Sequence, residues 1–577
     1  MVNIVIDGKS IQVPEKTTIL EAAKSVGIKI PTLCYFKGLN EIGACRICVV
    51  EVEGYDRLFT ACNSPVEEGM VIQTNSRKAR ETRKANLQFI LSEHQDRCPM
   101  CVRNGNCELQ KTAGDLNVHS TPFKKHIDDR TSNPDFPLIR DYSKCIKCMR
   151  CVQVCDKIQH SNVWDVVNSG GTITVDVGKA YRLEDAPCVL CGQCITHCPV
   201  GALHERDDTQ KLMDAIDDPD KIVLVQIAPA IRTAWCEEFG MKPEEATVNR
   251  LASALRIIGF DYVFDTNFSA DLTIMEESSE FVERLTHADQ FKFPMFTSCC
   301  PAWVRFVKAN WPKYIPQLST AKSPQQMFGA IAKSWYPQLL GVDPKRIFSV
   351  SVMPCLAKKA ECALPTMNSA GAGQDVDLAI TNREITRLIR AHQIDPTDLE
   401  DEQLDMPLGI GSGAGAIFGV TGGVMEAALR SAHYFVTGKN ASPETFKAVR
   451  GQQGWKEAEF EIGGTKLKVA VVNGLSNANQ LITELEKGRV HYDFVEVMAC
   501  PGGCVGGGGQ PIHAQKEMAP DRAPVLYNID KKLPWRYSHA NPSIIECYKS
   551  YLGKPLSERA HHLLHTDANG WKMPGEK

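Results

Sequence analysis

The sequence predicts a multidomain chain that is α+β in its N-terminal part and α/β in the remainder. Three observations predict it: a length of 577 residues, 23 cysteines that cluster at two- and three-residue gaps, and strands alternating with helical stretches after about residue 210. This length is enough for roughly three to five domains. The apolar content of 43% suits a globular core.

The overall charge and hydropathy exclude several classes of protein. The net charge of −4 gives no reason to expect nucleic acid or an anionic membrane surface as a partner. No apolar run reaches the roughly 18 residues of a transmembrane helix. The start, MVNIVIDGKSIQV, lacks the basic and apolar regions of a secretory signal, so we expect a cytoplasmic protein.

The cysteine pattern favours metal ligation over disulfides. In a small secreted protein such a number would indicate a disulfide framework. Here the chain is long, and its cysteines repeat at short, regular gaps. This pattern is typical of thiolates that bind iron–sulfur clusters.

The first segment, residues 1–78, combines a small β-rich domain with four cysteines. Residues 2–13 alternate apolar and polar around an Asp-Gly turn, which predicts a hairpin, and TTILEAAKSVGI follows as a capped helix. The C-x10-C-x2-C-x13-C spacing resembles the β-grasp fold of plant-type 2Fe–2S ferredoxins. Its long first gap is similar to that in large hydrogenases and in the NADH:quinone oxidoreductase. The resemblance implies one 2Fe–2S cluster on Cys34, Cys45, Cys48 and Cys62.

Residues 79–125 carry a histidine at a fixed distance from three cysteines. A helix starting at ANLQFIL breaks into a loop with the spacing H-x3-C-x2-C-x5-C. A single histidine is more often a core or surface residue, but imidazole is a good iron ligand and this spacing favours ligation. The motif resembles the same two enzyme families. It predicts a 4Fe–4S cluster on His94, Cys98, Cys101 and Cys107.

Residues 126–209 contain an internal repeat of C-x2-C-x2-C-x3-C. This is the pattern of two-cluster bacterial ferredoxins, in which the fourth cysteine of each run ligates the other cluster. Only the second run is followed by proline. We therefore predict two 4Fe–4S clusters, one on Cys145, Cys148, Cys151 and Cys198, the other on Cys188, Cys191, Cys194 and Cys155.

Residues 210–524 alternate strands and helices, as an α/β domain does. Three motifs follow strands in this region: TSCCPAW (297–303), MPCLAKKAEC (353–362) and EVMACPGGCVGGGGQP (496–511). In order and content they resemble the three signature motifs of the FeFe hydrogenases, of the large monomeric ferredoxin-dependent bacterial type. The tail, residues 525–577, is similar to the small subunit of two-chain members.

This resemblance implies an H-cluster, a 4Fe–4S cubane bridged to a diiron subsite that carries CO, cyanide and a dithiolate amine. The glycines of GGCVGGGG would let the backbone approach such a group. Lys358 would donate to one cyanide, a backbone amide of the loop at Ala228 and Pro229 to the other, and Met353, Met498, Gln325 and Phe418 would line the pocket. The implied cubane ligands are Cys300, Cys355, Cys500 and Cys504, the last also bridging to the subsite.

The adjacent cysteines of TSCCPAW have separate implied roles. Neighbouring side chains in an extended segment point to opposite sides, so Cys299 faces away from the direction of Cys300. A thiol titrates near pH 8.5 unless perturbed and can carry protons. By resemblance, a proton relay runs through Cys299, Glu277 and Ser319 to Glu280, with Arg284 near the exit.

Helix periodicity gives the glutamates of TIMEESSEFVERL different surroundings. Glu276 and Glu283 lie opposite the apolar face and are expected in solvent, while Glu277 lies on its shoulder and Glu280 further out. A partly buried Glu277 should have a raised pKa, which suits proton transfer.

The chain departs from the family pattern at several positions. Ala302 replaces a more common glycine before Trp303, and Ala230 stands where some members have serine. We hypothesise that Cys299 swings onto the open iron under oxidation. Cys236 and Cys362 are extra thiols near the motifs, and Cys236 and Cys547 are expected to be buried thiols without a ligand role.

The expected function is reversible reduction of protons to dihydrogen, with ferredoxin or flavodoxin as electron partner and maturation proteins installing the diiron subsite. The alternatives are a hydrogen sensor with the same cofactor, an electron-transfer subunit of a larger redox complex, and an iron–sulfur assembly factor. Sensors often lose the relay cysteine, whereas this chain keeps Cys299. Direct use of NAD(P)H is not expected, because GSGAGAIFGVTGG matches the hydrogenase domain rather than a nucleotide loop.

Overall fold

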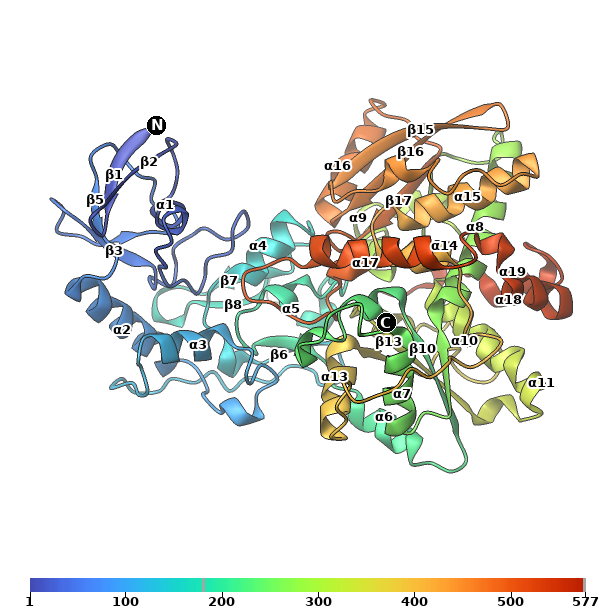
Figure 1. Ribbon diagram of the computed structural model, residues 1–577, viewed down its shortest axis with the longest axis horizontal. Coiled ribbons are helices and arrows are strands. Elements are labelled where there is room, and N and C mark those ends of the chain that lie inside the picture. The colour runs from blue at the N-terminus through green and yellow to red at the C-terminus, as the bar shows by residue number, and fades with distance from the viewer. Residues whose placement is uncertain (179–181, 574–577) are drawn as a thin grey trace.

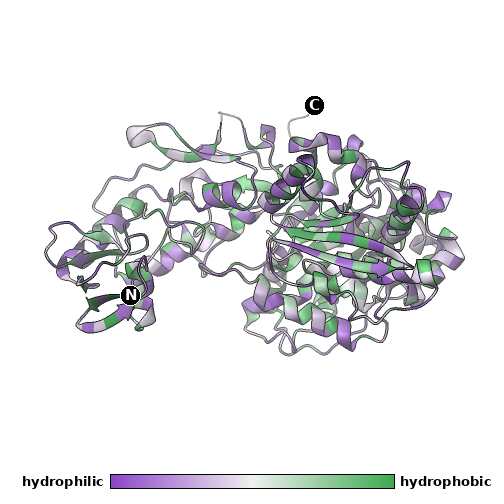
Figure 2. Ribbon diagram, turned by 90° about the horizontal axis from the view of Figure 1, so that it is seen from above, coloured by the Kyte–Doolittle hydropathy of each residue, from purple (hydrophilic) through white to green (hydrophobic). Residues whose placement is uncertain are grey.

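The computed structural model describes residues 1–178 and 182–573. The chain is elongated: the N-terminal strands lie at one end, the cysteine-rich segments lie in the middle, and a large α/β unit occupies the other end (Figure 1). The view from above shows the same arm extending from the larger body (Figure 2). The N-terminal sheet, the cysteine-rich segments and the α/β unit therefore follow one another in chain order, while the C-terminal helix α17 (Ala519–Lys532) turns back over the middle of the molecule.

The N-terminal unit is a five-stranded sheet in the order β2-β1-β5-β3-β4. The predicted hairpin is confirmed, with Val2 opposite Val13. The predicted helix begins at the cap Thr18, whose side chain accepts from the N–H of Glu21. The elements are β1 (Val2–Ile6), β2 (Lys9–Val13), α1 (Ile19–Ser25), β3 (Val49–Val52), β4 (Phe59–Thr60) and β5 (Val71–Gln73).

The middle of the molecule is held together by one buried arginine. Arg150 is 1% exposed, pairs with Glu108 at 2.7 Å and donates to the backbone carbonyl of Leu33 at 2.8 Å. It therefore joins three cysteine-bearing segments. The elements here are α2 (Arg77–Ser92), η1 (Cys98–Met100), α3 (Glu108–Asp115), β6 (Leu138–Arg140), η2 (Tyr142–Lys144), α4 (Arg150–Lys157), β7 (Trp164–Val167), η3 (Gly170–Thr172), β8 (Thr174–Val177), η5 (Leu183–Asp185), α5 (Gln193–His197) and β9 (Leu203–Glu205).

Two four-stranded sheets form the large α/β unit, as the strand–helix alternation predicts. One has the order β11-β10-β13-β14 and is parallel throughout; the other has the order β12-β17-β16-β15, in which only β15 is antiparallel to its neighbour. Their strands are β10 (Ile222–Ile227), β11 (Tyr262–Asp265), β12 (Met295–Phe296), β13 (Ile347–Met353), β14 (Leu378–Thr381), β15 (Trp455–Ile462), β16 (Thr465–Asn473) and β17 (Phe494–Met498).

Helices and short turns pack around both sheets (Figure 1). They are α6 (Thr209–Ile216), η6 (Pro229–Thr233), η7 (Glu237–Phe239), α7 (Val248–Ile258), α8 (Thr266–Thr286), α9 (Pro301–Asn310), η8 (Pro312–Gln317), α10 (Pro324–Ser334), α11 (Tyr336–Leu340), η9 (Pro344–Arg346), α12 (Ala357–Glu361), α13 (Asn382–Ala391), α14 (Gly413–Ala416), η10 (Ile417–Gly419), α15 (Gly423–Thr437), η11 (Lys447–Val449), α16 (Leu475–Glu486) and η12 (Cys504–Gly506). No helix in the described ranges is both long and apolar enough to cross a membrane.

The C-terminal segment, whose last four residues lie outside the described residues, packs against α8 and α10. It contains α17 (Ala519–Lys532), η13 (Ser538–Ala540), α18 (Pro542–Cys547), η14 (Tyr548–Leu552), α19 (Glu558–Leu564) and η15 (Ala568–Gly570). This packing overturns one prediction: Glu276, expected in solvent, is fully buried. The periodicity of one helix carries no information about a segment nearly 300 residues later in the chain that packs over its outer face. Glu283 is exposed, as predicted.

Candidate active site

A buried cavity of about 80 Å³ lies between the carboxyl ends of the two sheets. Loops that follow β10, β12, β13 and β17 reach it, which is where parallel sheets build their sites. Every pocket residue predicted from the sequence lines this one cavity: Ala228, Pro229, Gln325, Met353, Lys358, Phe418 and Met498. The structure therefore brings these residues together around one space, and their contacts to a bound group stay a prediction.

The predicted thiols converge on the same place. Cys299, Cys300, Cys355 and Cys504 line the cavity. Cys500 lies behind it; burial raises the pKa of its thiol, and the neighbouring Cys355 and Cys300 add to that effect. Segments far apart in the sequence thus bring four thiols together, as a cluster of several irons requires.

The two adjacent cysteines take different directions. Cys300 caps α9 and packs against the core that contains Trp303, while Cys299 packs against the separate core that contains Phe281 and Phe418. The expectation that the two sulfurs serve different sides is consistent with this packing.

A buried ion pair supports the cavity wall. Lys358 donates to Glu361 at 2.9 Å and to the backbone carbonyl of Cys299 at 3.3 Å. Gln325 donates to the same Glu361 oxygen at 3.1 Å. Glu361 belongs to the motif MPCLAKKAEC, and its spacing of three residues from Lys358, about one helical turn, is the sequence signal that could have predicted this pair.

The predicted relay residues are also brought together. Ser319 Oγ donates to Glu280 at 2.9 Å, and Arg284 donates to the other carboxylate oxygen at 2.5 Å. Glu280 and Arg284 are 7% and 4% exposed, so this outer end is more deeply buried than helix periodicity predicts. The backbone N–H of Thr320, a residue that no sequence pattern singled out, also donates to Glu280.

Glu277 is fully buried, and neither of its carboxyl oxygens meets full hydrogen-bond geometry with a described residue, although Ser319 and the Ser298 backbone lie near enough to lower its pKa somewhat. Burial, with the Glu280 charge adding, raises its pKa to about 8, as expected for a partly buried carboxyl. Burial, with the Glu277 charge adding, also raises the pKa of the Cys299 thiol well above its usual value.

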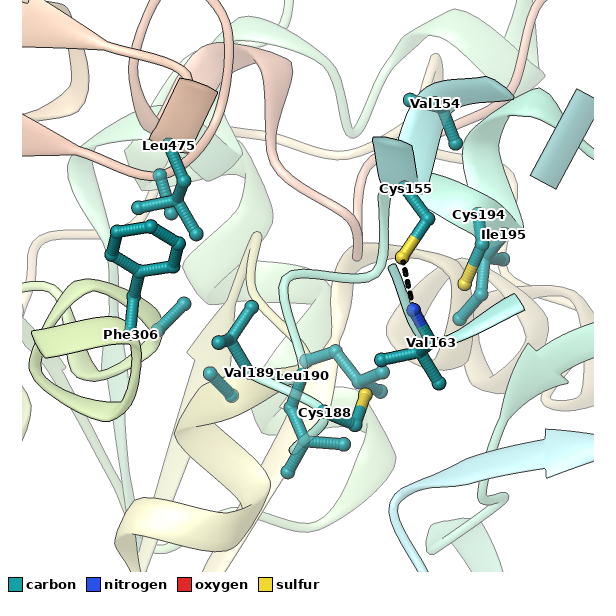
Figure 3. Close-up of a cluster of buried hydrophobic side chains, with 14 of the residues drawn as sticks. Val154, Cys155, Val163, Cys188, Val189, Leu190, Cys194, Ile195, Phe306 and Leu475 are labelled. Carbon is teal, nitrogen blue, oxygen red and sulfur yellow. Dashed lines mark hydrogen bonds between the residues drawn. The ribbon is translucent and has the colours of Figure 1, made fainter. Parts of the chain in front are cut away.

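The accessory cysteines surround a second, smaller cavity. Cys155, Cys188, Cys191 and Cys194 line about 20 Å³ of space. In Figure 3, three of these thiols lie around Val163, whose N–H donates to Cys155 Sγ at 3.3 Å. The fourth cysteine of the first run thus joins the second run, which is the crossed arrangement that the repeat predicts.

Members of the remaining predicted ligand sets also have neighbours in the arm, and their ligation of clusters stays a prediction. Burial raises the pKa of Cys198, and Cys145 is among the neighbours that add to it. The Cys34 N–H donates to Cys45 Sγ at 3.4 Å. His94 is 6% exposed, and its Nδ1 lies 3.0 Å from the Lys144 carbonyl, which leaves Nε2 for a metal.

Thiols line both the larger and the smaller cavity. Within residues 1–178 and 182–573, no three His, Cys, Asp or Glu side chains are spaced to hold one metal ion. The thiols surround wider spaces instead, and glycines keep the backbone close: a Cβ on Gly503 would lie 2.6 Å from the Thr421 nitrogen.

Comparisons with known proteins follow the same division of the chain. The family model "Iron only hydrogenase large subunit, C-terminal domain" matches residues 221–508. NADP-reducing hydrogenase subunit HndD of Solidesulfovibrio fructosivorans is 46% identical, over 98% of this chain and 98% of its own. This chain belongs to the FeFe hydrogenase family. Iron hydrogenase 1 of Clostridium pasteurianum is 42% identical, over 98% of this chain and 99% of its own.

Other family models cover the accessory segments. They are a 2Fe-2S iron-sulfur cluster binding domain (residues 1–77), the NADH-ubiquinone oxidoreductase-G iron-sulfur binding region (83–122), a 4Fe-4S dicluster domain (144–202) and the iron hydrogenase small subunit (516–567). A solved structure, a variant of the apo FeFe-hydrogenase HydA1 from Chlamydomonas reinhardtii, is 41% identical and covers 64% of this chain and 100% of its own, with a TM-score of 0.57. The chain is therefore an FeFe hydrogenase with accessory iron–sulfur domains.

The residues present fit the H-cluster of this family. Three of the proposed ligand thiols, the Lys358 ammonium and a largely apolar wall meet at one cavity, and the fourth thiol, Cys500, neighbours the other three. A Cβ on Gly509 would lie 2.9 Å from the Pro354 carbonyl carbon, so the loop leaves no room for a side chain there. Cys236 and Cys547 are buried, as predicted for thiols outside the site.

Proposed function

We propose that this hydrogenase catalyses the reversible reaction of two protons and two electrons to dihydrogen. One observation carries the proposal: three of the four thiols that would hold the H-cluster line the same cavity as the separate thiol of Cys299, and the fourth, Cys500, neighbours them. When bound, the H-cluster supplies the iron at which protons and electrons combine. Cys300, Cys355, Cys500 and Cys504 would hold it.

Pocket residues would orient and shield that group. The Lys358 ammonium, held by Glu361, is placed to donate a charged hydrogen bond to a cyanide nitrogen. Met353, Met498 and Phe418 exclude water from the cavity. In the loop at Ala228 and Pro229, proline has no N–H and the Ala228 N–H donates to the Val352 carbonyl at 3.1 Å, so an amide for the other cyanide would come from the next residue, Ala230, which also lines the cavity.

We infer a proton relay along Cys299, Glu277, Ser319 and Glu280. Three features support the relay. The Glu277 charge raises the pKa of the Cys299 thiol, the pKa of Glu277 is about 8, and Ser319 donates a hydrogen bond to Glu280. A carboxyl with a pKa near neutral both takes and releases protons readily. Arg284 fixes the outer carboxylate near the exit.

Electrons would travel along the arm, singly, through one 2Fe–2S and three 4Fe–4S clusters. The predicted ligand sets follow one another from the N-terminal sheet to the cavity, and Cys191 is among the neighbours that raise the pKa of Cys500. The domain limits 1–78, 79–125, 126–209, 210–524 and 525–577 remain a proposal, as do the maturation proteins as partners.

Two electron partners call for separate tests. We propose ferredoxin, or flavodoxin, as donor. The relative HndD is named as a subunit of an NADP-reducing hydrogenase, and its 46% identity favours, as second candidate, a role as the hydrogenase subunit of such an assembly. The matured protein should evolve dihydrogen anaerobically from reduced ferredoxin and not from NADPH alone. Activity only with NADPH and added partner subunits would favour the second candidate.

A sensor remains the competing use of the same cofactor. The presence of Cys299, Glu277 and Glu280 in one buried constellation favours catalysis over sensing. Trace turnover by a protein whose H-cluster is spectroscopically intact would favour the sensor.

A further inference from the structure

The C-terminal segment pairs directly with the segment that carries Ser319. The Lys322 N–H donates to the Leu564 carbonyl and the Thr566 N–H to the Thr320 carbonyl, both at 2.8 Å, in an antiparallel bridge. On its other edge, the Ser319 N–H donates to Phe296 in β12 at 2.7 Å. The relay segment is therefore held like a strand between β12 and the chain's end.

His565 adds a side-chain link to this pairing. It is 7% exposed; its Nδ1 lies 2.8 Å from Thr320 Oγ1, and its Nε2 lies 3.0 Å from Glu276. Because the Glu276 carboxylate can only accept a hydrogen bond, we assign the ring proton of His565 to Nε2. Nδ1 is then left to accept from the Thr320 hydroxyl. The Glu276 carboxylate also accepts from the Tyr548 hydroxyl and, at 2.9 Å, from the Leu556 N–H.

Thr320 connects this network to the relay. Its hydroxyl faces His565, and its N–H donates to both oxygens of Glu280 at 3.2 and 3.1 Å. Ser319 donates to the same carboxylate. Two of the groups that orient Glu280 thus lie on the segment that the C-terminal residues hold in place.

We propose that Glu276, His565 and Thr320 form a clamp through which the C-terminal segment positions Ser319 and Glu280 for proton transfer. The clamp is defined by these three residues, and His565 is a positioning residue. The inference rests on the relay under Proposed function. It gives the part of the chain that matches the small-subunit model a role in proton delivery, since His565 and Tyr548 both lie within residues 516–567.

A purely structural role predicts a different result from a positioning role. Loss of packing alone would lower the melting temperature and the amount of active enzyme without changing how the remaining enzyme handles protons. Misplacement of Glu280 would make proton transfer rate-limiting, because small displacements of reacting groups slow transfer steeply. The solvent isotope effect and the pH profile of turnover distinguish the two.

The experiment uses the full-length, matured protein and measures dihydrogen evolution per intact H-cluster in H2O and D2O. His565→Leu and Thr320→Val should slow turnover between about tenfold and about a hundredfold and enlarge the solvent isotope effect, with KM for the electron donor unchanged. His565→Gln, which can donate and accept at similar positions, should recover most of the rate. Thr320→Val keeps the backbone N–H to Glu280 and tests the link if His565→Leu fails to fold.

Two comparison variants separate the clamp from the relay. His561→Leu removes an exposed imidazole that stacks on the His565 ring, with centroids 4.8 Å apart, and should leave turnover unchanged. Glu280→Gln tests the relay itself. If Glu280→Gln loses turnover while His565→Leu and Thr320→Val keep the parent rate, isotope effect and pH profile, the clamp is wrong and the relay stands. If Glu280→Gln keeps the parent rate, the relay is wrong.

Discussion

Gly192 and Gly508 pack backbone against backbone where the cysteine-rich arm meets the catalytic unit. A Cβ on Gly508 would lie 2.5 Å from the Gly192 Cα, closer than side-chain atoms approach. Gln193 reinforces the contact by donating to the Gly506 carbonyl at 2.9 Å. Cys191 and Cys504 flank this junction, so the two glycines bring the last accessory cluster site and the H-cluster site as close as the backbone allows.

Gly508→Ala should slow electron delivery while sparing chemistry at the site. The added methyl group forces the two loops apart, and electron transfer falls steeply with distance. Dihydrogen evolution from reduced ferredoxin should drop, whereas exchange of H2 with D2O, which needs no net electrons, should stay near the parent rate. Gly114→Ala in α3, where a Cβ meets nothing within 4 Å, is the control. Equal loss of both activities in Gly508→Ala would contradict this account.

Glu277→Gln should make the thermal stability of the protein less sensitive to rising pH. Burial, with the Glu280 charge adding, raises the pKa of Glu277 from 4.5 to about 8. In the unfolded chain the Glu277 carboxyl has its ordinary, lower pKa and releases its proton above that pH, whereas in the folded chain it retains the proton. The carboxyl therefore destabilises the fold increasingly from about pH 5 to about pH 8. The amide does not titrate.

Thermal unfolding of the anaerobic protein across that pH range measures the effect. The melting temperature of the parent should fall more than that of Glu277→Gln. The same variant should lose about a hundredfold or more of its turnover, as expected when a proton-transfer group is removed. Parallel melting curves at every pH would show that the carboxyl is not held protonated by its surroundings.

Glu361→Gln should destabilise the protein by about 3 kcal/mol, because it leaves the Lys358 ammonium buried without its counter-charge. Lys358→Met in the same background should recover part of that loss, since both charges are then gone. Denaturant unfolding of the parent, the two single variants and the double variant gives the coupling free energy between Lys358 and Glu361. Additive losses in the double variant would mean that the pair does not interact.

His94→Cys should lower the reduction potential of the cluster that it ligates. A thiolate adds a negative charge where a neutral imidazole stood, which favours the oxidised cluster. A redox titration followed by electron paramagnetic resonance should show one signal shifted to lower potential and the others unchanged. An unchanged set of potentials would indicate that His94 is not a ligand.

The sequence predicted those features that depend on residues close together along the chain. Cysteine spacings identified the accessory sites, and three motifs identified the thiols around the cavity. Each motif begins within or directly after the last residues of a strand, and parallel strands bring their carboxyl ends to a common edge, so local patterns led to a three-dimensional site. The pocket residues Gln325 and Phe418 followed from the family resemblance rather than from any local pattern.

Features created by contact between distant segments were missed. Helix periodicity predicted that Glu276 is exposed to solvent, because the sequence of α8 contains no sign that His565 and Tyr548 cover this residue. For the same reason the sequence did not reveal that Arg150 reaches back to Leu33, or that Thr320 faces the end of the chain. The raised pKa of Cys299 likewise depends on burial, which is a property of the assembled fold.

The most direct test of the central claim is anaerobic dihydrogen evolution from reduced ferredoxin by the matured protein and its Cys299→Ala variant, each with its H-cluster verified by infrared spectroscopy. The account predicts fast turnover by the parent and its near-complete loss in the variant, with the accessory cluster signals unchanged. Trace turnover by the parent despite an intact H-cluster, or full turnover by Cys299→Ala, would contradict it.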